Sequence, residues 1–284
     1  MPCPEAGPAP GGPAWRQRLA LTAILALALG LRLVELERCG WGAEYYTAAV
    51  RSMALGWHNF FFAAFDPAGF ISVDKPPLAL WLQVLSVKLL GFSPLAVLLP
   101  QVLAGVAAVA VLYAMARPRF GAAVGLMAAF LLAFTPVWVA ANRTNNTDSC
   151  LLLMLLLAGW ALIKAAETSS RPRLCLALAL IGLGFNVKML AACIVLPGFA
   201  LVYWLGAAKP WPRRLMDLGL AGLVFVATAL PWVLAVELTP PAERPYIGSS
   251  RTNSMLELIV GHNAGSRFIS HLLPAAPFAP AAPA

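Results

Sequence analysis

Residues 95–116 read LAVLLPQVLAGVAAVAVLYAMA, and none of these side chains is charged. A helix of that length rises about 33 Å at 1.5 Å per residue, which matches the hydrocarbon core of a bilayer, about 30 Å thick. Burying so apolar a stretch in a soluble domain would require a charged exterior. The chain lacks one, because 61% of its 284 residues are hydrophobic and 11% are charged, against about 25% charged in soluble proteins. The stretch therefore predicts a membrane-spanning helix.

Further apolar runs lie on both sides of this helix. They cover Leu19–Leu36, Ala122–Ala141, Cys150–Ala166, Leu174–Ala208 and Leu215–Val236. The run Leu174–Ala208 is too long for one crossing and contains the polar residues Asn186 and Lys188. We therefore divide it into two short helices that turn near Lys188–Ala192. The sequence thus predicts an all-α polytopic membrane protein with about seven transmembrane helices.

The charged residues gather between the runs, and their signs predict the orientation. With the N-terminus in the cytoplasm, the cytoplasmic segments hold Arg16, Arg18, Arg117, Arg119, Lys164, Arg171, Arg173, Lys209, Arg213 and Arg214 against only Glu5, Glu167 and Asp217. The opposite face holds Arg38, Arg51, Lys75, Lys88, Arg143, Arg244, Arg251 and Arg267 against Glu35, Glu37, Glu44, Asp66, Asp74, Asp148, Glu237, Glu243 and Glu257. Short cytoplasmic loops are enriched in Lys and Arg. We therefore expect a multi-pass plasma (inner) membrane protein whose working face is periplasmic or extracellular.

The same composition bounds the domain organisation. Residues 1–18 are expected to form a disordered cytoplasmic tail, residues 19–268 the transmembrane domain, and residues 269–284 an Ala/Pro-rich disordered tail. Within the domain, the outer loop 37–94 carries short aromatic runs that predict interfacial helices at the headgroup level.

Composition and residue spacing disfavour two kinds of function, nucleic-acid binding and a cysteine-based metal or redox site. The net charge of +8 is not arranged as a basic patch with interleaved aromatics, so we expect no nucleic-acid partner. The five cysteines show neither CxxC nor CxxH spacing and are expected to be unpaired. They are Cys3, Cys39, Cys150, Cys175 and Cys193.

Three polar stretches fall on the predicted outer face. They are Ala43-Glu44-Tyr45-Tyr46 after the first span, Val73-Asp74-Lys75-Pro76-Pro77 in the outer loop, and Asn142-Arg143-Thr144-Asn145-Asn146-Thr147-Asp148 between the third and fourth spans. A carboxylate near a membrane boundary can act as a general base, and a nearby Lys or Arg can neutralise a phosphate leaving group. Together the stretches indicate a site for a phospholipid-linked donor.

The order of the motifs resembles glycosyltransferase family 39, the protein O-mannosyltransferases and aminoarabinose-type lipid A transferases of the GT-C superfamily. The resemblance covers roughly Leu19–Phe268 and is carried by Glu44-Tyr45-Tyr46, Asp74-Lys75-Pro76-Pro77, Leu112-Tyr113, Arg117-Pro118-Arg119-Phe120-Gly121, Thr135-Pro136 and Asn145-Asn146-Thr147-Asp148. Phe65-Asp66-Pro67 and Ser72-Val73-Asp74-Lys75-Pro76-Pro77 look characteristic of its bacterial mannosyltransferase branch. Members usually carry more spans and often a soluble C-terminal domain, so the chain resembles a shortened member.

The resemblance implies a GT-C-like membrane glycosyltransferase. It implies an inverting transfer of a mannose-like or aminoarabinose-like sugar from a polyprenyl-phosphate carrier to a hydroxyl on a lipid or protein acceptor. Membrane lipids would be further partners. No cofactor is assigned: a carboxylate pair could hold a divalent ion, but the ligand set is too sparse to claim a metal site.

Glu44 would be the acid of the first outer loop, where the family's catalytic base resides. The family pattern Asp-Glu-x-Tyr-Tyr, anchored on Tyr45 and Tyr46, places Gly42 and Ala43 in the acidic positions and Glu44 in the variable one. An ordinary loop carboxylate is the alternative for Glu44. The two tyrosines are expected to bind substrate.

Asp74 and Lys75 match a family motif in which the lysine approaches the donor phosphate, with Asp74 as a further catalytic carboxylate. The prolines that follow favour an extended backbone that aims both side chains. The alternative is a solvated Asp-Lys turn.

Asp148 is the third candidate catalytic carboxylate, and Arg143 is its expected partner and a substrate ligand. Asp148 could instead cap the fourth span. Lys188 is expected to bind substrate, because an ionisable group at membrane depth is by default a functional hypothesis, although it could snorkel to the outer interface. Arg32 is a similar case nearer its helix end.

Two other functions remain open from the sequence. A small transporter or polyprenyl-lipid flippase would explain the intramembrane Lys188 and Arg32, but it would favour inverted repeats, and the two halves show none. A non-catalytic membrane scaffold would explain the short length. It would not explain three polar stretches on one face.

Overall fold

The computed structural model describes residues 14–265, and that part of the chain is helical with no β-strand. The helices are α1 (Ala14–Leu33), α2 (Glu44–Met53), α3 (Trp57–Phe61), α4 (Leu78–Leu90), α5 (Pro94–Phe134), α6 (Pro136–Asn142), α7 (Asp148–Thr168), α8 (Arg171–Lys188), α9 (Leu190–Cys193), α10 (Leu196–Gly206), α11 (Trp211–Ala229) and α12 (Pro231–Leu238). Short 3-10 turns cover Leu36–Cys39 and Pro241–Glu243, and a π-helical segment covers Glu257–Gly265. The all-α expectation is confirmed.

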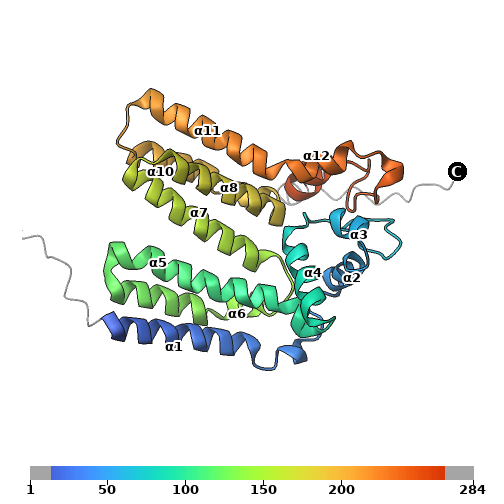
Figure 1. Ribbon diagram of the computed structural model, residues 1–284, viewed down its shortest axis with the longest axis horizontal. Coiled ribbons are helices and arrows are strands. Elements are labelled where there is room, and N and C mark those ends of the chain that lie inside the picture. Colours follow the sequence, from blue (N-terminus) through green and yellow to red (C-terminus); the bar gives the residue numbers. More distant parts are fainter. Residues whose placement is uncertain (1–13, 266–284) are drawn as a thin grey trace, which may run out of the picture.

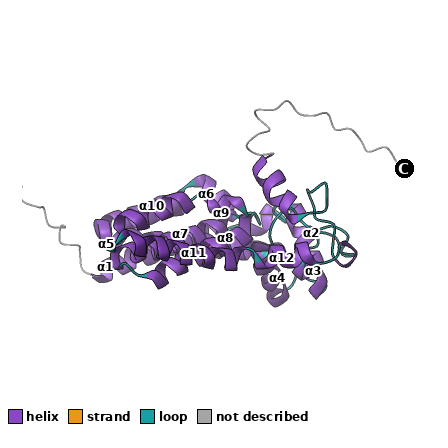
Figure 2. Ribbon diagram, turned by 90° about the horizontal axis from the view of Figure 1, so that it is seen from above, coloured by secondary structure: helices purple, strands orange, loops and turns teal. Residues whose placement is uncertain are grey.

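The long helices form a bundle of parallel rods, and the shorter outer helices gather at one end of it (Figure 1). Along the bundle, α1 packs on α5, α5 on α7, α7 on α8 and α8 on α11. Seen from above, the bundle is a narrow slab, with α2, α3, α4 and α12 at the end away from the N-terminus (Figure 2). The fold is thus a membrane-type bundle with a helical head at one end.

The first helix begins earlier than expected. It starts at Ala14, so residues 14–18 of the predicted tail are helical, because no helix breaker lies between Pro13 and the apolar run. The remainder of that tail, Cys3 and the predicted tail 269–284 lie outside the described residues.

Helix α5 contains the predicted span 95–116 and most of the predicted span 122–141, whose last residues form α6 after Thr135. Ser93 caps the N-terminus of α5, because the Ser93 hydroxyl accepts a hydrogen bond from the Ala96 amide at 3.2 Å. The helix is interrupted at Gly121, where φ is 85° and ψ is 169°. Beyond this break the chain folds back, since a Cβ at Gly125 would lie 3.1 Å from Arg117 Cβ. The interruption falls between the predicted spans 95–116 and 122–141.

By length and composition, α1, α5 and α7 are each apolar enough to cross a membrane. A fourth crossing results if α11 and α12 count as one span, bent by 47°. The predicted pair within 174–208 corresponds to α8 and to α9 with α10, and the chain turns at Met189 (φ 44°) as expected. The polytopic fold is confirmed, and the total of about seven crossings stays a prediction.

The segments predicted to be cytoplasmic meet at one end of the bundle. Asp217 is fully buried there and accepts hydrogen bonds from Arg171 Nε (2.5 Å), Lys209 Nζ (2.5 Å) and Tyr203 Oη (2.8 Å). The carboxylate thereby joins α8, α10 and α11. We call these four residues the Asp217 node.

The outer loop 37–94 packs on the opposite end of the bundle. Trp81 on α4 donates its indole N–H to the Phe60 carbonyl (2.7 Å), and Trp232 on α12 donates to the Phe61 carbonyl (2.8 Å). Short helix α3 is therefore fixed from two sides by tryptophans distant in sequence. The short helices that the sequence predicted in this loop are present in the structure.

Candidate active site

The polar stretches of the sequence meet around one cavity of about 460 Å³ at the head of the bundle. Its lining consists of Gly42, Ala43, Tyr46, Lys75, Thr144, Asn146 and Lys188. Residues from the first outer loop, from the loop before α7 and from the end of α8 thus share one space. Three of the residues expected to bind substrate, Tyr46, Lys75 and Lys188, line it, and that role stays a prediction. We call this space the polar cavity.

Asn145 fixes the first of these segments against the second. Its side-chain oxygen accepts from the Ala43 amide (2.7 Å), and its side-chain nitrogen donates to the Ala43 carbonyl (3.2 Å) and to Thr47 Oγ1 (2.8 Å). Gln83 on α4 donates to the Asn145 carbonyl (3.1 Å). A fully buried asparagine thus positions the start of α2. The sequence analysis gave Asn145 no role of its own and so missed this positioning role.

Lys75 enters the cavity from a tightly bonded loop. Asp66 Oδ2 accepts from the amides of Phe70 and Ile71, both at 2.9 Å, and closes the turn before it. Burial acts to raise the Asp66 pKa, but the Ile71 and Phe70 amides outweigh it and hold the pKa below its ordinary value. The loop is also paired to the segment that follows α3, since the Val73 amide donates to the Ala63 carbonyl at 3.0 Å.

The Lys75 side chain is only 4% exposed and forms an ion pair with Asp74. Tyr46 Oη donates to Asp74 Oδ1 at 3.5 Å. Tyr45 stacks on Phe65 instead of lining the cavity. Burial raises the pKa of Tyr45, and the Asp74 charge raises it further. Asp74 and Lys75 are therefore part of a half-buried polar cluster and not of a solvated turn.

Lys188 and Asp148 form the second ion pair of the site. Lys188 is the last residue of α8 and Asp148 is the first of α7, so the pair joins two helix ends. Asn146 Nδ2 also donates to Asp148 Oδ2 at 2.7 Å. Lys188 faces the polar cavity, and the Asp148 side chain is 35% exposed beside it.

The expected pairing of Arg143 with Asp148 is wrong. Arg143 lies on the other side of the Asn-rich stretch and donates to the carbonyls of Leu31 and Val34, both at 2.8 Å. It lines a second cavity of about 710 Å³, bounded by α1 and α6. The sequence could not distinguish the partner because Lys188 is forty positions away from Asp148, whereas Arg143 is a near neighbour.

Glu44 does not line the polar cavity, although its neighbours Ala43 and Tyr46 do. It is the first residue of α2 and its side chain is exposed. Gly42 and Ala43, which occupy the acidic positions of the family pattern, are both cavity residues. The carboxylates nearest to the two cavity lysines are therefore Asp74 and Asp148.

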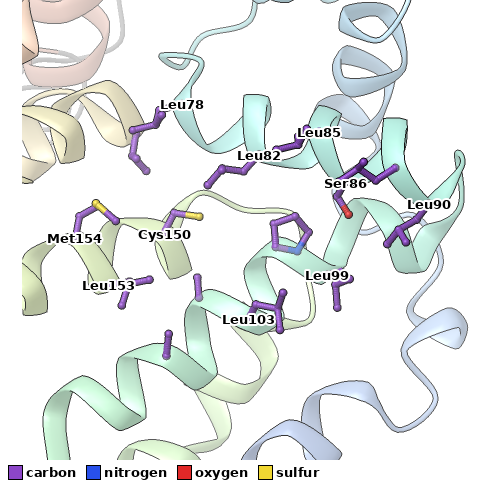
Figure 3. Close-up of a pocket in the computed structure, with 15 residues that line it drawn as sticks. Leu78, Leu82, Leu85, Ser86, Leu90, Leu99, Leu103, Cys150, Leu153 and Met154 are labelled. Carbon is purple, nitrogen blue, oxygen red and sulfur yellow. The ribbon is translucent and has the colours of Figure 1, made fainter. Parts of the chain in front are cut away.

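An apolar groove of about 510 Å³ lies between α4, α5 and α7, and Figure 3 shows the side chains that face one another across it. Its lining includes Leu82, Leu85, Leu99, Leu103, Leu153 and Met154. Leu78, Cys150 and Val187 also line it, and each lies within three residues of Lys75, Asp148 or Lys188. Three short chain segments, 75–78, 146–150 and 187–188, thus contribute to the lining of both the polar cavity and the groove.

No cluster of three His, Cys, Asp or Glu residues within 14–265 is placed to hold a metal ion. Both carboxylates that flank the polar cavity are instead engaged by lysines. The cysteines at 39, 150, 175 and 193 are free, as expected.

Comparison with known proteins shows the family of the chain. The model of the family described as dolichyl-phosphate-mannose-protein mannosyltransferase matches residues 74–234, more than half of the chain. The chain belongs to this family. The family match begins at Asp74, the residue before the cavity lysine, and includes Lys188. The resemblance to glycosyltransferase family 39 is thereby confirmed.

Two curated relatives come from Bacillus subtilis strain 168. The chain is 42% identical over 248 residues to a protein named "Putative mannosyltransferase YycA" and 43% identical over 249 residues to one named "Putative mannosyltransferase YkcB". These alignments cover 87% and 88% of the chain but only 36% and 35% of the relatives. The chain thus spans about a third of the length of the curated relatives it matches.

A solved structure shares the fold. The crystal structure of ArnT from Cupriavidus metallidurans in the apo state superposes with a TM-score of 0.61 at 22% identity. The superposition covers 80% of this chain and 43% of that one. The GT-C membrane fold is therefore confirmed for this family member.

Proposed function

We propose that this chain binds a polyprenyl-phosphate-linked sugar and supports transfer of that sugar to a hydroxyl on a lipid or protein acceptor at the outer face of the plasma membrane. The observation that carries the proposal is that three short chain segments, 75–78, 146–150 and 187–188, line both the polar cavity and the apolar groove. A polyprenyl phosphate has the same division, because a charged phosphate is joined to a long hydrocarbon chain. The family membership and the names of the relatives support a mannose-like sugar. An aminoarabinose-like sugar remains the second candidate.

Lys75 and Lys188 are the proposed phosphate ligands. In the absence of donor each is neutralised by its own carboxylate, Asp74 or Asp148. A phosphate placed in the polar cavity offers both lysines a second anion and charge-assisted hydrogen bonds. The prenyl chain then follows Leu78 and Val187 into the groove, whose apolar lining takes the place of the surrounding lipid chains. Arg143 has no part in this site because it faces the other cavity.

Transfer with inversion needs a base opposite the leaving phosphate. The acceptor hydroxyl oxygen bonds to the anomeric carbon while the bond from that carbon to the phosphate oxygen breaks. The electron pair leaves with the polyprenyl phosphate, whose charge Lys75 and Lys188 stabilise. A carboxylate takes the hydroxyl proton. We assign this role to Asp148, the more exposed of the two paired carboxylates, and give Asp74 the role of positioning Lys75.

The proposal is tested by donor consumption in membranes that hold equal amounts of each variant. Lys75→Ala and Lys188→Ala should each reduce consumption of a polyprenyl-phosphate sugar by about tenfold or more, since each removes a charge-assisted phosphate contact. Asp148→Asn should reduce turnover by about 10²-fold or more while donor binding persists. Glu44→Gln should have a small effect, because its side chain is exposed and the cavity lysines pair with Asp74 and Asp148 instead.

Lys88→Ala is the matched control, because Lys88 is an exposed lysine on α4 that lines neither cavity nor groove. Unchanged consumption in both cavity-lysine variants would refute the donor site. Donor binding without consumption in the unmodified chain would instead favour the carrier or scaffold function.

A further inference from the structure

The second cavity lies between α1 and α6, on the far side of Gly42 and Thr144 from the polar cavity. Its walls are mostly apolar and include Leu31, Phe134, Pro136 and Val139. Arg143 and Cys39 contribute its polar edge. Such a space suits an amphiphile with one charged group, and neither the proposed donor site nor its reaction makes use of it.

The charge of Arg143 is not balanced by an acid. Its guanidinium donates to the carbonyls of Leu31, Val34 and Glu35 and to Cys39 Sγ (3.3 Å), and within residues 14–265 it forms no ion pair. The nearby Glu35 carboxylate is engaged by Arg38 at 2.7 Å. Carbonyl dipoles solvate the guanidinium but leave its net charge in place.

Arg32 is a second cation without an acidic partner in the described range, and it follows the cavity residue Leu31 on α1. Arg32 on α1 is fully buried and donates to Asn142 Oδ1 (2.7 Å) and to the carbonyls of Ala28 and Ala133, without an ion pair in the described range. Its Nη2 has no hydrogen-bond partner. Two positive charges thus lie at the α1–α6 contact, where screening by solvent is weak. The contrast with Lys75 and Lys188 is direct, because each of those has its own carboxylate.

We propose that the α1–α6 cavity binds an anionic glycerophospholipid, with its phosphate at Arg143 and its acyl chains along Leu31, Phe134 and Val139. Charge complementarity selects an anionic headgroup. Nη1 of Arg143 stays engaged by the Leu31 and Val34 carbonyls, and the phosphate takes Nε together with Nη2, whose contacts with Glu35 (3.4 Å) and Cys39 (3.3 Å) are long. The apolar walls accept the chains. This site is separate from the donor site, and its occupancy does not depend on sugar transfer.

Cys39 provides a reporter in the cavity wall. The experiment compares the chain in phosphatidylcholine nanodiscs with the chain in nanodiscs that also contain phosphatidylglycerol. We expect phosphatidylglycerol to slow the alkylation of Cys39 by a neutral maleimide several-fold. The measured quantity is the ratio of the alkylation rates without and with phosphatidylglycerol. A ratio is needed because Arg143 contacts Cys39, so replacing Arg143 alone changes the reactivity of the thiol. Arg143→Gln should bring this ratio to about one, and Arg143→Lys should keep part of the protection.

A second cysteine controls for the general effect of surface charge. Cys39→Ser combined with Ala242→Cys places the thiol at an exposed position that lines a different cavity at the same end. Its rate should not depend on phosphatidylglycerol. Equal slowing at position 242, no slowing at Cys39, or protection that survives Arg143→Gln would each overturn the proposal. Stronger protection of Cys39 by polyprenyl phosphate than by phosphatidylglycerol would also overturn it, by assigning the cavity to the carrier lipid.

Discussion

At the scale of single residues, Gly42 explains why this chain departs from the acidic pattern of its family. Its φ is +67°, and a Cβ there would lie 2.8 Å from Asn145 Oδ1. Asn145 in turn holds the Ala43 backbone. An aspartate at position 42 would therefore disturb the asparagine that shapes the polar cavity.

Gly42→Ala tests this close contact. Any side chain at a left-handed position costs roughly 1–2 kcal/mol, and here the contact with Asn145 adds to the strain, so we expect lower thermal stability and reduced donor consumption. The matched control is Gly40→Ala, where φ is also positive at +64° but a Cβ would meet nothing within 4 Å. The temperature of thermal unfolding and the rate of donor consumption should both be lower in the Gly42 variant than in the control. Equal losses in both would remove the role of the contact.

The sequence predicted which residue types form the site better than it predicted their partners. Lys75 and Lys188 were expected from their motif and their depth, and both face the polar cavity. The partner of Asp148 was missed because it comes from a helix end distant in sequence. Pairs of this kind depend on how helices pack, which one sequence does not disclose. The choice of the base among Glu44, Asp74 and Asp148 stays a prediction.

At the scale of elements, helix contacts in this bundle depend on small residues, because lipid offers no hydrophobic drive for helix association. Gly182 on α8 shows the closest approach to α11: a Cβ there would lie 1.9 Å from Thr228 Oγ1 and 2.9 Å from the Phe225 carbonyl. Helix α8 ends at Lys188. The glycine therefore sets the position of a cavity lysine from six residues away.

Gly182→Ala should separate α8 from α11. Overpacking typically costs about 1–3 kcal/mol, so we expect lower thermal stability in detergent, together with weaker donor binding through a displaced Lys188. Gly219→Ala on α11 is the control, because its Cβ would meet nothing within 4 Å. Stability of the control should be unchanged or slightly higher, since alanine is the better helix former. A Gly182 variant as stable as the control would contradict the close packing.

Element boundaries were predictable where apolar runs end at breakers. The break at Gly121 and the turn at Met189 fall where the sequence placed them. The early start of α1 at Ala14 and the packing of the outer helices by Trp81 and Trp232 were not foreseen. Those features depend on tertiary contacts that hydropathy does not report.

At the scale of the whole molecule, polar groups hold both ends of an apolar bundle. The polar cavity is at one end, and the Asp217 node joins α8, α10 and α11 at the other. The expected orientation would place the node in the cytoplasm and the cavity outside. The grouping of the predicted inner segments at one end agrees with the charge pattern, and sidedness itself stays a prediction.

Asp217→Asn should destabilise the bundle more than any change at the surface. Removing a buried charge from its cationic partners typically costs about 3–5 kcal/mol, which thermal unfolding in nanodiscs would detect as a clear loss of stability. Glu167→Gln is the control, because this carboxylate is largely exposed between Arg119 and Lys164, and exposed pairs contribute about 0–1 kcal/mol. Similar losses in the two variants would show that the node is dispensable.

The two lysine–carboxylate pairs around the polar cavity have a consequence for the timing of the reaction. A lysine that turns toward an arriving phosphate loosens its contact with the carboxylate and leaves that carboxylate open to the acceptor hydroxyl. On the proposed mechanism the base is therefore engaged by its lysine until the donor is in place. Donor would then bind before acceptor, and in the resting state no carboxylate of the site would be open to activate water.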